Sequence, residues 1–281
     1  MHKDLLDLLA CPACADGGGF TVDPEPDNGE LEAGTLTCRD CSAAFPIRDG
    51  IPRFVDADDD YAGNFSFQWN TWRTLQIDRL SGHSLSEDRF FADSRWPKDG
   101  LTGKLVLDAG CGAGRFADIA ADHGATVVAV DLSGAVDACR ETTADRDGRV
   151  HCIQASILDL PLKPGVFDAV YCMGVIQHTP DPEAVMRRLP RHLKPGGRLA
   201  YNFYEEGLWR RLQAIKYALR LITPHLSIQT TLAISAFLVG LFYPLTRLLA
   251  PIPKVRILNH FIPIAAVHDA QLTPAQQRAW T

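Results

Sequence analysis

The segment Val106-Leu-Asp-Ala-Gly-Cys-Gly-Ala-Gly-Arg-Phe116 decides how this chain folds. A short apolar run at 105–107 precedes the glycines and is typical of a buried strand, whereas residues 115–123 have the spacing of an amphipathic helix. Glycine lets the backbone turn tightly and approach a ligand, because it carries no Cβ. The unpaired N–H groups at the start of the helix favour an anion. The segment therefore predicts a strand, a glycine loop and a helix that bind a small ligand.

The alternation of strand and helix continues toward the C-terminus. Apolar runs predict further strands at 127–130, 150–154, 167–173 and 198–203, and helices are expected at 135–146 and 182–193. Pro190 should kink or shorten the second of these helices. Strands that alternate with helices at this spacing indicate βαβ units and a parallel sheet. The predicted fold class is α/β, with a parallel-sheet core over residues 101–204.

Two features of the glycine loop distinguish between cofactor classes. The pattern is G-x-G-x-G rather than the G-x-G-x-x-G of dinucleotide-binding proteins. Asp108 precedes the turn, and a carboxylate there suits the ammonium group of a methionine moiety but would repel a pyrophosphate. Asp131 ends the next strand and can accept two hydrogen bonds from a ribose diol. The residues therefore favour S-adenosyl-L-methionine (SAM) over a nicotinamide dinucleotide.

The stretch from Lys104 to Tyr204 resembles the class I SAM-dependent methyltransferases, whose core is a Rossmann-like parallel sheet. Its glycine loop, Asp131, Phe167-Asp168 and Leu193-Lys-Pro-Gly-Gly197 match motifs of that family. Ser156 departs from the pattern, since it stands where the family has an acid that contacts adenine. The resemblance implies methyl transfer and a cofactor site formed by Asp108, Gly110, Gly112, Gly114, Arg115, Asp131, Leu132, Ser156, Ile157 and Met173.

His178, which follows the fourth predicted strand, is the candidate general base. A base is needed only if the methyl acceptor must lose a proton, and the alternative is a loop histidine with a structural role. The segment Cys172-Met-Gly-Val175 stands where many amino-group methyltransferases carry an Asn-Pro-Pro-Tyr-type motif, which disfavours methylation of a planar nitrogen. Trp69 belongs to an aromatic-rich segment that is expected to close over the cofactor.

Four of the eight cysteines form two C-x-x-C pairs, Cys11-Pro-Ala-Cys14 and Cys38-Arg-Asp-Cys41. Two such pairs can place four thiolates tetrahedrally around one Zn²⁺, and four cysteines close the coordination sphere, so the predicted ion is structural. The charged N-terminus does not have the form of a signal peptide. A cytoplasmic location is therefore expected, where paired cysteines indicate a metal rather than disulfides.

Residues 1–55 resemble the Trm112-like zinc-ribbon family. The resemblance rests on Leu8-Leu-Ala-Cys-Pro-Ala-Cys14, on Cys38-Arg-Asp-Cys41 and on Phe45-Pro-Ile-Arg-Asp-Gly-Ile-Pro-Arg-Phe54. Some members of that family are small partners that bind and stabilise methyltransferases. The resemblance therefore implies a fused stabilising or docking domain, which a linker and an aromatic-rich helical segment at 56–100 connect to the sheet.

Residues 205–281 differ in composition from the rest of the chain. Residues 221–246 contain no Asp, Glu, Lys or Arg, and basic residues flank them on both sides. Three interpretations remain open, namely a membrane span, a pair of interfacial helices, and a hydrophobic helical lid or insertion over an apolar substrate. The lid is favoured. The final strands of related methyltransferases are not recognisable after Phe203, so the chain is interpreted as truncated at its C-terminus.

The overall composition limits the function. The chain has 281 residues, a net charge of −6 and no evident basic stripe, which disfavours a nucleic-acid partner. The predicted function is methyl transfer from SAM to a small-molecule acceptor of apolar or lipid-linked character. A non-catalytic scaffold or partner-docking protein, and an RNA or protein methyltransferase, are the alternatives. Any peripheral membrane contact of this otherwise cytoplasmic chain is expected through residues 205–256.

Overall fold

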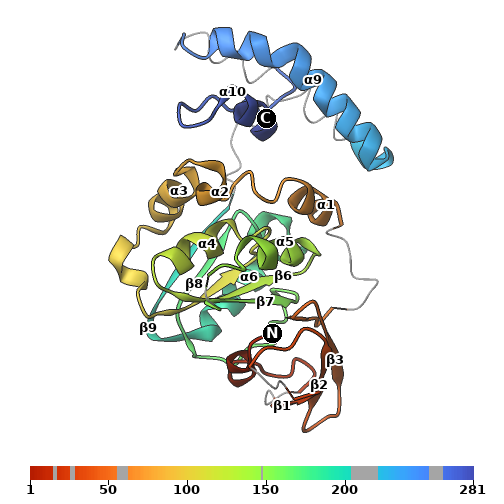
Figure 1. Ribbon diagram of the computed structural model, residues 1–281, viewed down its shortest axis with the longest axis vertical. Coiled ribbons are helices and arrows are strands. Elements are labelled where there is room, and N and C mark those ends of the chain that lie inside the picture. The colour runs from red at the N-terminus through yellow and green to blue at the C-terminus, as the bar shows by residue number, and fades with distance from the viewer. Residues whose placement is uncertain (15–17, 26–28, 56–62, 147, 204–220, 253–261) are drawn as a thin grey trace. The chain divides into compact units, whose positions relative to one another are not determined.

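The computed structural model describes residues 1–14, 18–25, 29–55, 63–146, 148–203, 221–252 and 262–281 (Figure 1). The chain forms two compact units, Met1–Tyr204 and Glu205–Thr281. The first unit contains a parallel sheet with helices and a smaller antiparallel sheet. The second unit is helical in the part that the structure describes.

A five-stranded parallel sheet forms the centre of the first unit, in the order β7-β6-β5-β8-β9. Its strands are β5 (Leu105–Ala109), β6 (Thr126–Asp131), β7 (Val150–Gln154), β8 (Phe167–Met173) and β9 (Leu193–Asn202). The connecting helices are α4 (Arg115–Asp122), α5 (Ala135–Thr142) and α6 (Pro182–Arg188). The predicted α/β parallel-sheet fold is confirmed. Helix α6 ends before Pro190, which lies in a 3-10 turn at Leu189–His192.

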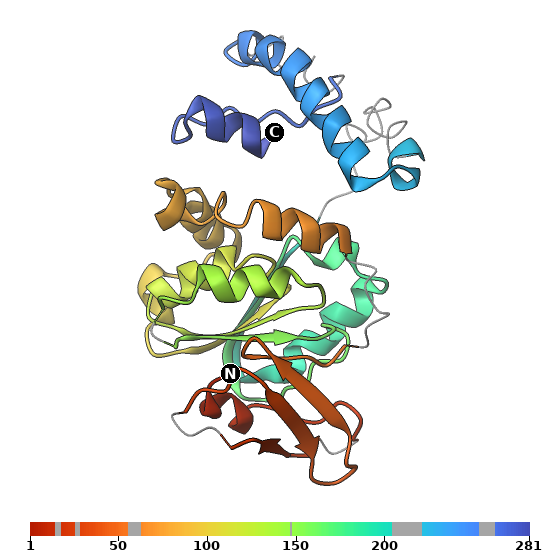
Figure 2. The same cartoon turned by 45° about the vertical axis from the view of Figure 1, so that its right-hand side comes forward.

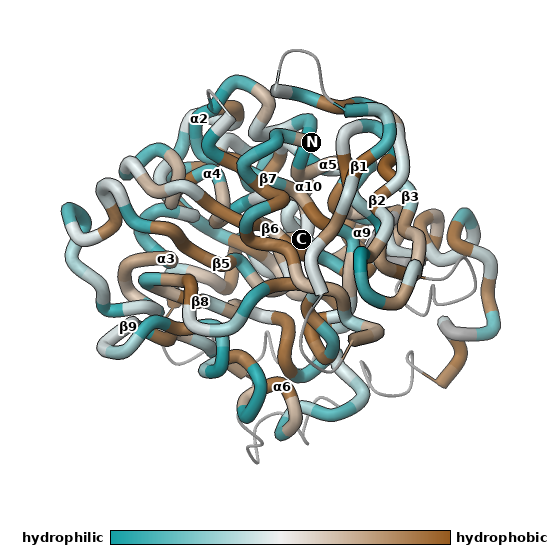
Figure 3. Tube along the Cα trace, turned by 90° about the horizontal axis from the view of Figure 1, so that it is seen from below, coloured by the Kyte–Doolittle hydropathy of each residue, from teal (hydrophilic) through white to brown (hydrophobic). Residues whose placement is uncertain are grey.

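Alternate residues of the central strands face two different hydrophobic cores. Val106, Val127 and Ala129 belong to a core that helices α3 and α4 cover, whereas Leu107 and Val128 belong to the core on the opposite face. This division follows from the period of two in a β-strand. The strands β5 and β6 accordingly carry apolar residues at most successive positions, which are brown in Figure 3.

Three helices precede the sheet, namely α1 (Gly63–Thr71), α2 (Asp78–Ser81) and α3 (Leu85–Ser94), followed by a 3-10 turn at Lys98–Leu101. Phe90 of α3 is fully buried and contacts the rings of Phe116 and Tyr171 at centroid distances of 5.9 and 5.1 Å. Asp118 of α4, 1% exposed, accepts hydrogen bonds from both Arg79 and Arg146. These contacts fix the segment before the sheet against α4.

The N-terminal antiparallel sheet lies on the face of the parallel sheet opposite to α4 (Figure 2). It consists of β1 (Phe20–Asp23), β2 (Gly34–Cys38), β3 (Ala44–Arg48) and β4 (Ile51–Pro52), preceded by a 3-10 helix at Lys3–Asp7. We call residues 1–55 the ribbon. Leu5 and Leu9 of the ribbon share one core with Leu107 and Val128 of the parallel sheet. The ribbon and the sheet therefore do not have separate cores.

The ribbon also covers the edge strand β7. Arg53 forms a parallel bridge with Gln154, and the Phe54 N–H donates to the Gln154 carbonyl at 2.8 Å. A second bridge joins Leu9 to Leu162. Because an unpaired edge strand is prone to associate with other chains, these contacts protect one side of the sheet.

The second unit contains α9 (Ile228–Leu249), a 3-10 turn at Thr223–His225 and α10 (Pro274–Trp280). The Ser227 side chain accepts a hydrogen bond at the start of α9, and a capping box of Thr273 and Gln276 starts α10. By length and composition alone, α9 could cross a membrane. The predicted hydrophobic helical segment after the sheet is thus present.

Candidate cofactor-binding site

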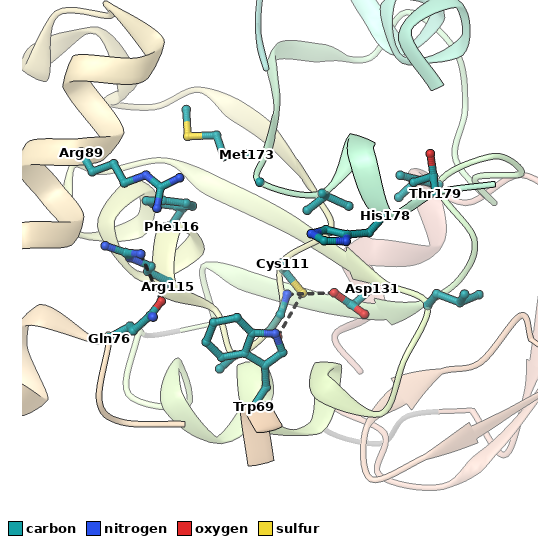
Figure 4. Close-up of a pocket in the computed structure, with 17 residues that line it drawn as sticks. Trp69, Gln76, Arg89, Cys111, Arg115, Phe116, Asp131, Met173, His178 and Thr179 are labelled. Carbon is teal, nitrogen blue, oxygen red and sulfur yellow. Dashed lines mark hydrogen bonds between the residues drawn. The ribbon is translucent and has the colours of Figure 1, made fainter. Parts of the chain in front are cut away.

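The candidate site is a cavity of about 330 Å³ at the carboxyl ends of the central strands (Figure 4). It lies where the strand order changes direction, next to β5, and ligands of open α/β sheets bind at such switch points. The cavity is lined by Trp69, Gln76, Arg89, Gly110, Cys111, Gly112, Ala113, Arg115, Phe116, Asp131, Leu132, Ile157, Met173, Gly174, Val175, His178 and Thr179. Eight of the predicted site residues are therefore brought together.

The glycine loop requires glycine at three positions. Gly110, Gly112 and Gly114 have φ values of 92°, 52° and 83°, in the left-handed region that residues with a Cβ rarely adopt. A Cβ on Gly110 would lie 2.5 Å from the Val175 side chain, and one on Gly112 would lie 3.3 Å from the Trp69 indole nitrogen. The loop is therefore packed against Val175 on one side and the Trp69 ring on the other.

Asp131 ends β6 and lines the cavity, where burial raises the pKa of its carboxyl group. Its Oδ2 accepts from the Gly112 N–H at 2.9 Å, and its Oδ1 accepts from the Ser133 N–H and hydroxyl at 2.9 and 2.8 Å. These hydrogen bonds oppose the effect of burial and fix the orientation of the carboxylate. A carboxylate has about four acceptor positions, so Asp131 keeps capacity for a ligand hydroxyl.

Asp108 lies behind the glycine loop rather than in the lining of the cavity. It is only 2% exposed, and burial raises its pKa to about 8 although the nearby Tyr171 hydroxyl lowers it. A carboxyl group with this pKa is mostly uncharged at pH 7, so it attracts an ammonium group only weakly. The predicted contact with a methionine ammonium group stays a prediction, without direct support from this geometry.

A pair of arginines lines one end of the cavity. The Arg115 guanidinium donates to the Ser86 hydroxyl at 2.9 Å and to the Gln76 side-chain oxygen at 3.1 Å. Burial, together with the charge of Arg89, lowers the pKa of Arg115 to about 10, so it remains charged at neutral pH. The Arg115 and Arg89 guanidinium carbons lie 5.1 and 5.9 Å from the Phe116 ring centroid. This end of the cavity is suited to an anion.

The opposite end of the cavity contains Asp131, His178 and Thr179, as Figure 4 shows. His178 is exposed in the 3-10 turn Ile176–His178, and its backbone N–H donates to the Val175 carbonyl at 2.8 Å. Ile157 and Met173 contribute apolar surface to the lining. An elongated ligand with an anionic end and a ribose or base at the other end would fit this distribution.

Two further predicted residues lie outside the described lining. Gly114 forms the N-cap of α4, where a Cβ would lie 2.9 Å from the Cys139 sulfur. The Ser156 hydroxyl accepts from the Leu158 N–H at 3.2 Å and so serves a local turn. Their roles in cofactor binding stay predictions.

Gln76 and Arg89 both line the cavity, although neither was predicted from the sequence. They lie 34 and 21 residues before Gly110 in the chain, and no spacing rule relates them to the glycine loop. The presence of a basic residue, Arg89, in the helix before the glycine loop would have been only a weak indication that it lines the site. The positions of α2 and α3 on α4 bring these side chains to the cavity.

The four ribbon cysteines form a second candidate site, because their Sγ atoms all lie within 4.8 Å of one another. The Sγ atoms of Cys11 and Cys41 are 3.8 Å apart, and those of Cys14 and Cys38 are 3.6 Å apart. Four thiolates at about 2.3 Å from a tetrahedral Zn²⁺ would be separated by about 3.8 Å. The residues therefore fit the structural zinc ion that the spacing predicts.

Comparisons with known proteins give two domain matches. Residues 107–201 match the family described as methyltransferase domain, and residues 2–50 match the family described as Trm112p-like protein. The ubiquinone biosynthesis O-methyltransferase of Idiomarina loihiensis is 37% identical over 107 residues, which cover 37% of this chain and 44% of that protein. The enzyme of the same name from Xanthomonas campestris is 42% identical over 101 residues, covering 35% and 42%.

A solved SAM-dependent methyltransferase from Mesorhizobium loti is 27% identical, with a TM-score of 0.36 and coverage of 41% of this chain and 52% of that one. The chain spans about half the length of the curated relatives that it matches. 

The glycine loop, Asp131 and the cavity-lining residues from Gly110 to Met173 all fall within the methyltransferase-domain match. The four predicted zinc ligands fall within the Trm112p-like match. This chain therefore carries a methyltransferase domain of Rossmann-like fold joined to an N-terminal Trm112p-like domain.

Proposed function

We propose that this protein is a SAM-dependent methyltransferase that acts on a small-molecule acceptor. The observation that carries the proposal is the cavity itself, which combines the glycine loop, the carboxylate of Asp131 and the arginine pair at a switch point of the sheet. The reducing cytoplasm is the proposed location, since none of the eight cysteines is paired in a disulfide.

The polarity of the cavity supports one orientation of the cofactor. Asp131 would accept a hydrogen bond from the ribose diol, and Ile157 would contact the adenine ring, while Met173, on the arginine side of the cavity (Figure 4), would contact the methionine moiety. Arg115 and Arg89, at the other end, would bind the carboxylate of the methionine moiety. Trp69, packed against Gly112, would cover the ligand and exclude water.

The bound cofactor would supply a methyl group attached to a sulfonium sulfur. That sulfur is a good leaving group, because it departs as a neutral thioether. The protein would contribute alignment of the acceptor and exclusion of water, which together lower the barrier by several kcal/mol. We propose an oxygen acceptor, as the names of the relatives indicate for those enzymes. His178 lines the cavity and would accept the hydroxyl proton of such an acceptor.

Calorimetric titration of the whole, zinc-loaded chain with SAM tests the proposal, with S-adenosylhomocysteine and NAD as comparison ligands. We expect micromolar binding of the first two and none of NAD. Asp131→Ala should weaken SAM binding by roughly 10- to 100-fold, because it removes a charge-assisted hydrogen bond. Asp99→Ala is the matched control, since Asp99 is an exposed carboxylate outside the cavity lining.

The result also distinguishes the alternatives. Absence of SAM binding by a folded wild-type chain would contradict the proposal and leave a scaffold or partner-docking role. Binding that Asp131→Ala leaves unchanged would contradict the assignment of the ribose contact. If SAM binds, methylation assays with phenolic, protein and RNA acceptors then identify the acceptor class.

A further inference from the structure

Helix α9 carries a continuous stripe of exposed apolar side chains. We call this set the α9 stripe, and its members are Ile234, Phe237, Leu241, Leu245 and Leu248. Their exposed fractions lie between 37% and 72%. The spacing of three and four residues places all five on one side of an α-helix. A contiguous exposed apolar surface of this kind marks an interaction site more often than scattered residues do.

The opposite side of α9 is already occupied within the second unit. Tyr243 and Thr246 are 2% and 1% exposed, and Tyr243 packs in a small core with Ile262 and Ile264. The Tyr243 hydroxyl donates to the Gln277 side-chain oxygen at 2.7 Å. The α9 stripe is therefore the outward surface of a helix whose inner surface forms the core of its unit.

The charged side chains in the stretch of sequence that includes α9, residues 207–268, are all of one sign. Residues 207–268 contain no Asp or Glu, although the chain as a whole has a net charge of −6. The same range contains the basic residues Arg210, Arg211, Lys216, Arg220, Arg247, Lys254 and Arg256. Basic residues that accompany an apolar helix surface are complementary to anionic lipid headgroups.

We propose that the α9 stripe inserts into the surface of a bilayer that contains anionic lipids, with α9 lying in the plane of the interface. A helix of 22 residues is long enough to span, at about 1.5 Å per residue. Spanning would, however, draw the segment packed on its inner surface into the hydrocarbon, including Asp269, Gln277 and Arg278. Charged groups there are costly, whereas an interfacial helix leaves them on the water side.

The test is co-sedimentation of the whole chain with vesicles of phosphatidylcholine alone or mixed with phosphatidylglycerol. We expect binding to the mixed vesicles that decreases as salt is raised, because salt screens the basic residues. The double variant Phe237→Ser, Leu241→Ser should bind at least roughly tenfold more weakly. Each substitution removes the favourable free energy of moving an apolar side chain from water into the bilayer. The matched control is Leu80→Ser with Phe203→Ser, two exposed apolar residues of the first unit.

A second variant makes the test independent of the apolar change. Arg247→Glu, in the last turn of α9, should lower binding to the mixed vesicles and reduce its salt dependence. Circular dichroism of each variant checks that α9 is still folded. Equal sedimentation with both vesicle types, or unchanged binding by the stripe variant, would overturn the proposal.

Two further outcomes would replace the bilayer surface with another explanation. Protein that stays with the vesicles after extraction at pH 11, and whose C-terminus is protected from protease, would indicate a span. If the wild-type chain forms a stable oligomer and does not bind vesicles, while the stripe variant is monomeric, a second copy of the chain covers the stripe. Because these measurements do not involve SAM, they are independent of the proposed methyltransferase activity.

Discussion

The guanidinium of Arg53 donates a hydrogen bond to the Asp137 carboxylate at 2.7 Å and a second one to the Gln154 side-chain oxygen at 2.8 Å. Arg53 belongs to the ribbon, whereas Asp137 lies in α5 and Gln154 ends β7. One side chain therefore joins the ribbon to both a helix and a strand of the methyltransferase domain. Arg53 is 9% exposed, so these contacts are made largely out of water.

Arg53→Ala should lower the free energy of unfolding of the whole chain by about 2 kcal/mol, because it removes two hydrogen bonds that involve a charged group. Urea denaturation monitored by circular dichroism measures the change. Arg187→Ala, which removes only the exposed ion pair with Glu183, should change the stability by less than about 0.5 kcal/mol. Similar effects of the two substitutions would contradict a stabilising role of Arg53.

Removal of zinc should destabilise the methyltransferase domain as well as the ribbon, because Leu5 and Leu9 complete a core that contains Leu107 and Val128. Residues 1–55 contain no tryptophan, so tryptophan fluorescence reports on the rest of the chain. We expect a chelator to lower the midpoint of the fluorescence-monitored thermal transition, and added Zn²⁺ to restore it. A transition that the chelator does not move would show that the domains unfold independently.

Gly110→Ala should weaken SAM binding and lower stability, since the new Cβ would lie 2.5 Å from the Val175 side chain at a φ of 92°. The left-handed conformation alone costs about 1–2 kcal/mol. Gly196→Ala is the control for that cost, because its φ is 78° and its Cβ would meet nothing within 4 Å. Calorimetry should find SAM affinity lost in Gly110→Ala and kept in Gly196→Ala; equal affinities would refute the loop assignment.

Asp108 should make the chain less stable as pH rises from about 4 to about 8. Its folded pKa is raised to about 8, so between these pH values the folded state binds a proton that the unfolded state has released. The stability contribution is present below the unfolded pKa and falls by up to about 1.4 kcal/mol per pH unit. Asp108→Asn removes this dependence, so its stability relative to wild type should improve from pH 5 to pH 7 in urea titrations. A constant difference would contradict the raised pKa.

His178→Gln should lower kcat by roughly 10²- to 10⁴-fold if the acceptor is a hydroxyl that must lose its proton, the range typical of a general base. SAM affinity should stay unchanged, because the imidazole is assigned to the acceptor. His225→Gln, an exposed histidine of the second unit, serves as the control in the same steady-state assay. An unchanged kcat would assign His178 a structural role.

The sequence predicted the parallel sheet well, because its strands are apolar runs and its glycine loop has a local conformational cause. The three loop glycines have positive φ values that other residues rarely adopt. The cluster of four cysteines could be predicted equally well, since their spacing in the sequence reflects the geometry of one bound ion. Both kinds of signal depend on residues that are close in the chain or chemically distinctive.

Burial across long distances could not be predicted in the same way. The position of Asp108 next to the glycine loop predicts a ligand contact. In the folded chain, however, its side chain is buried, and this burial leaves its carboxyl group largely uncharged at neutral pH. Arg89 reaches the cavity because α3 packs on α4. The shared core of ribbon and sheet likewise depends on contacts between Leu9 and residues near Leu162, which no local pattern connects.

The pairing of Leu9 with Leu162 has a consequence for how the chain is made. The ribbon leaves the ribosome before the sheet, and Leu162 follows Leu9 after some 150 residues, or roughly 8 to 30 s of synthesis. During that interval the apolar surface of Leu5 and Leu9 lacks its native partners from the sheet. Zn²⁺ needs only residues up to Cys41, so it can order the ribbon early. The supply of metal to the nascent chain would then set how much protein reaches its native state.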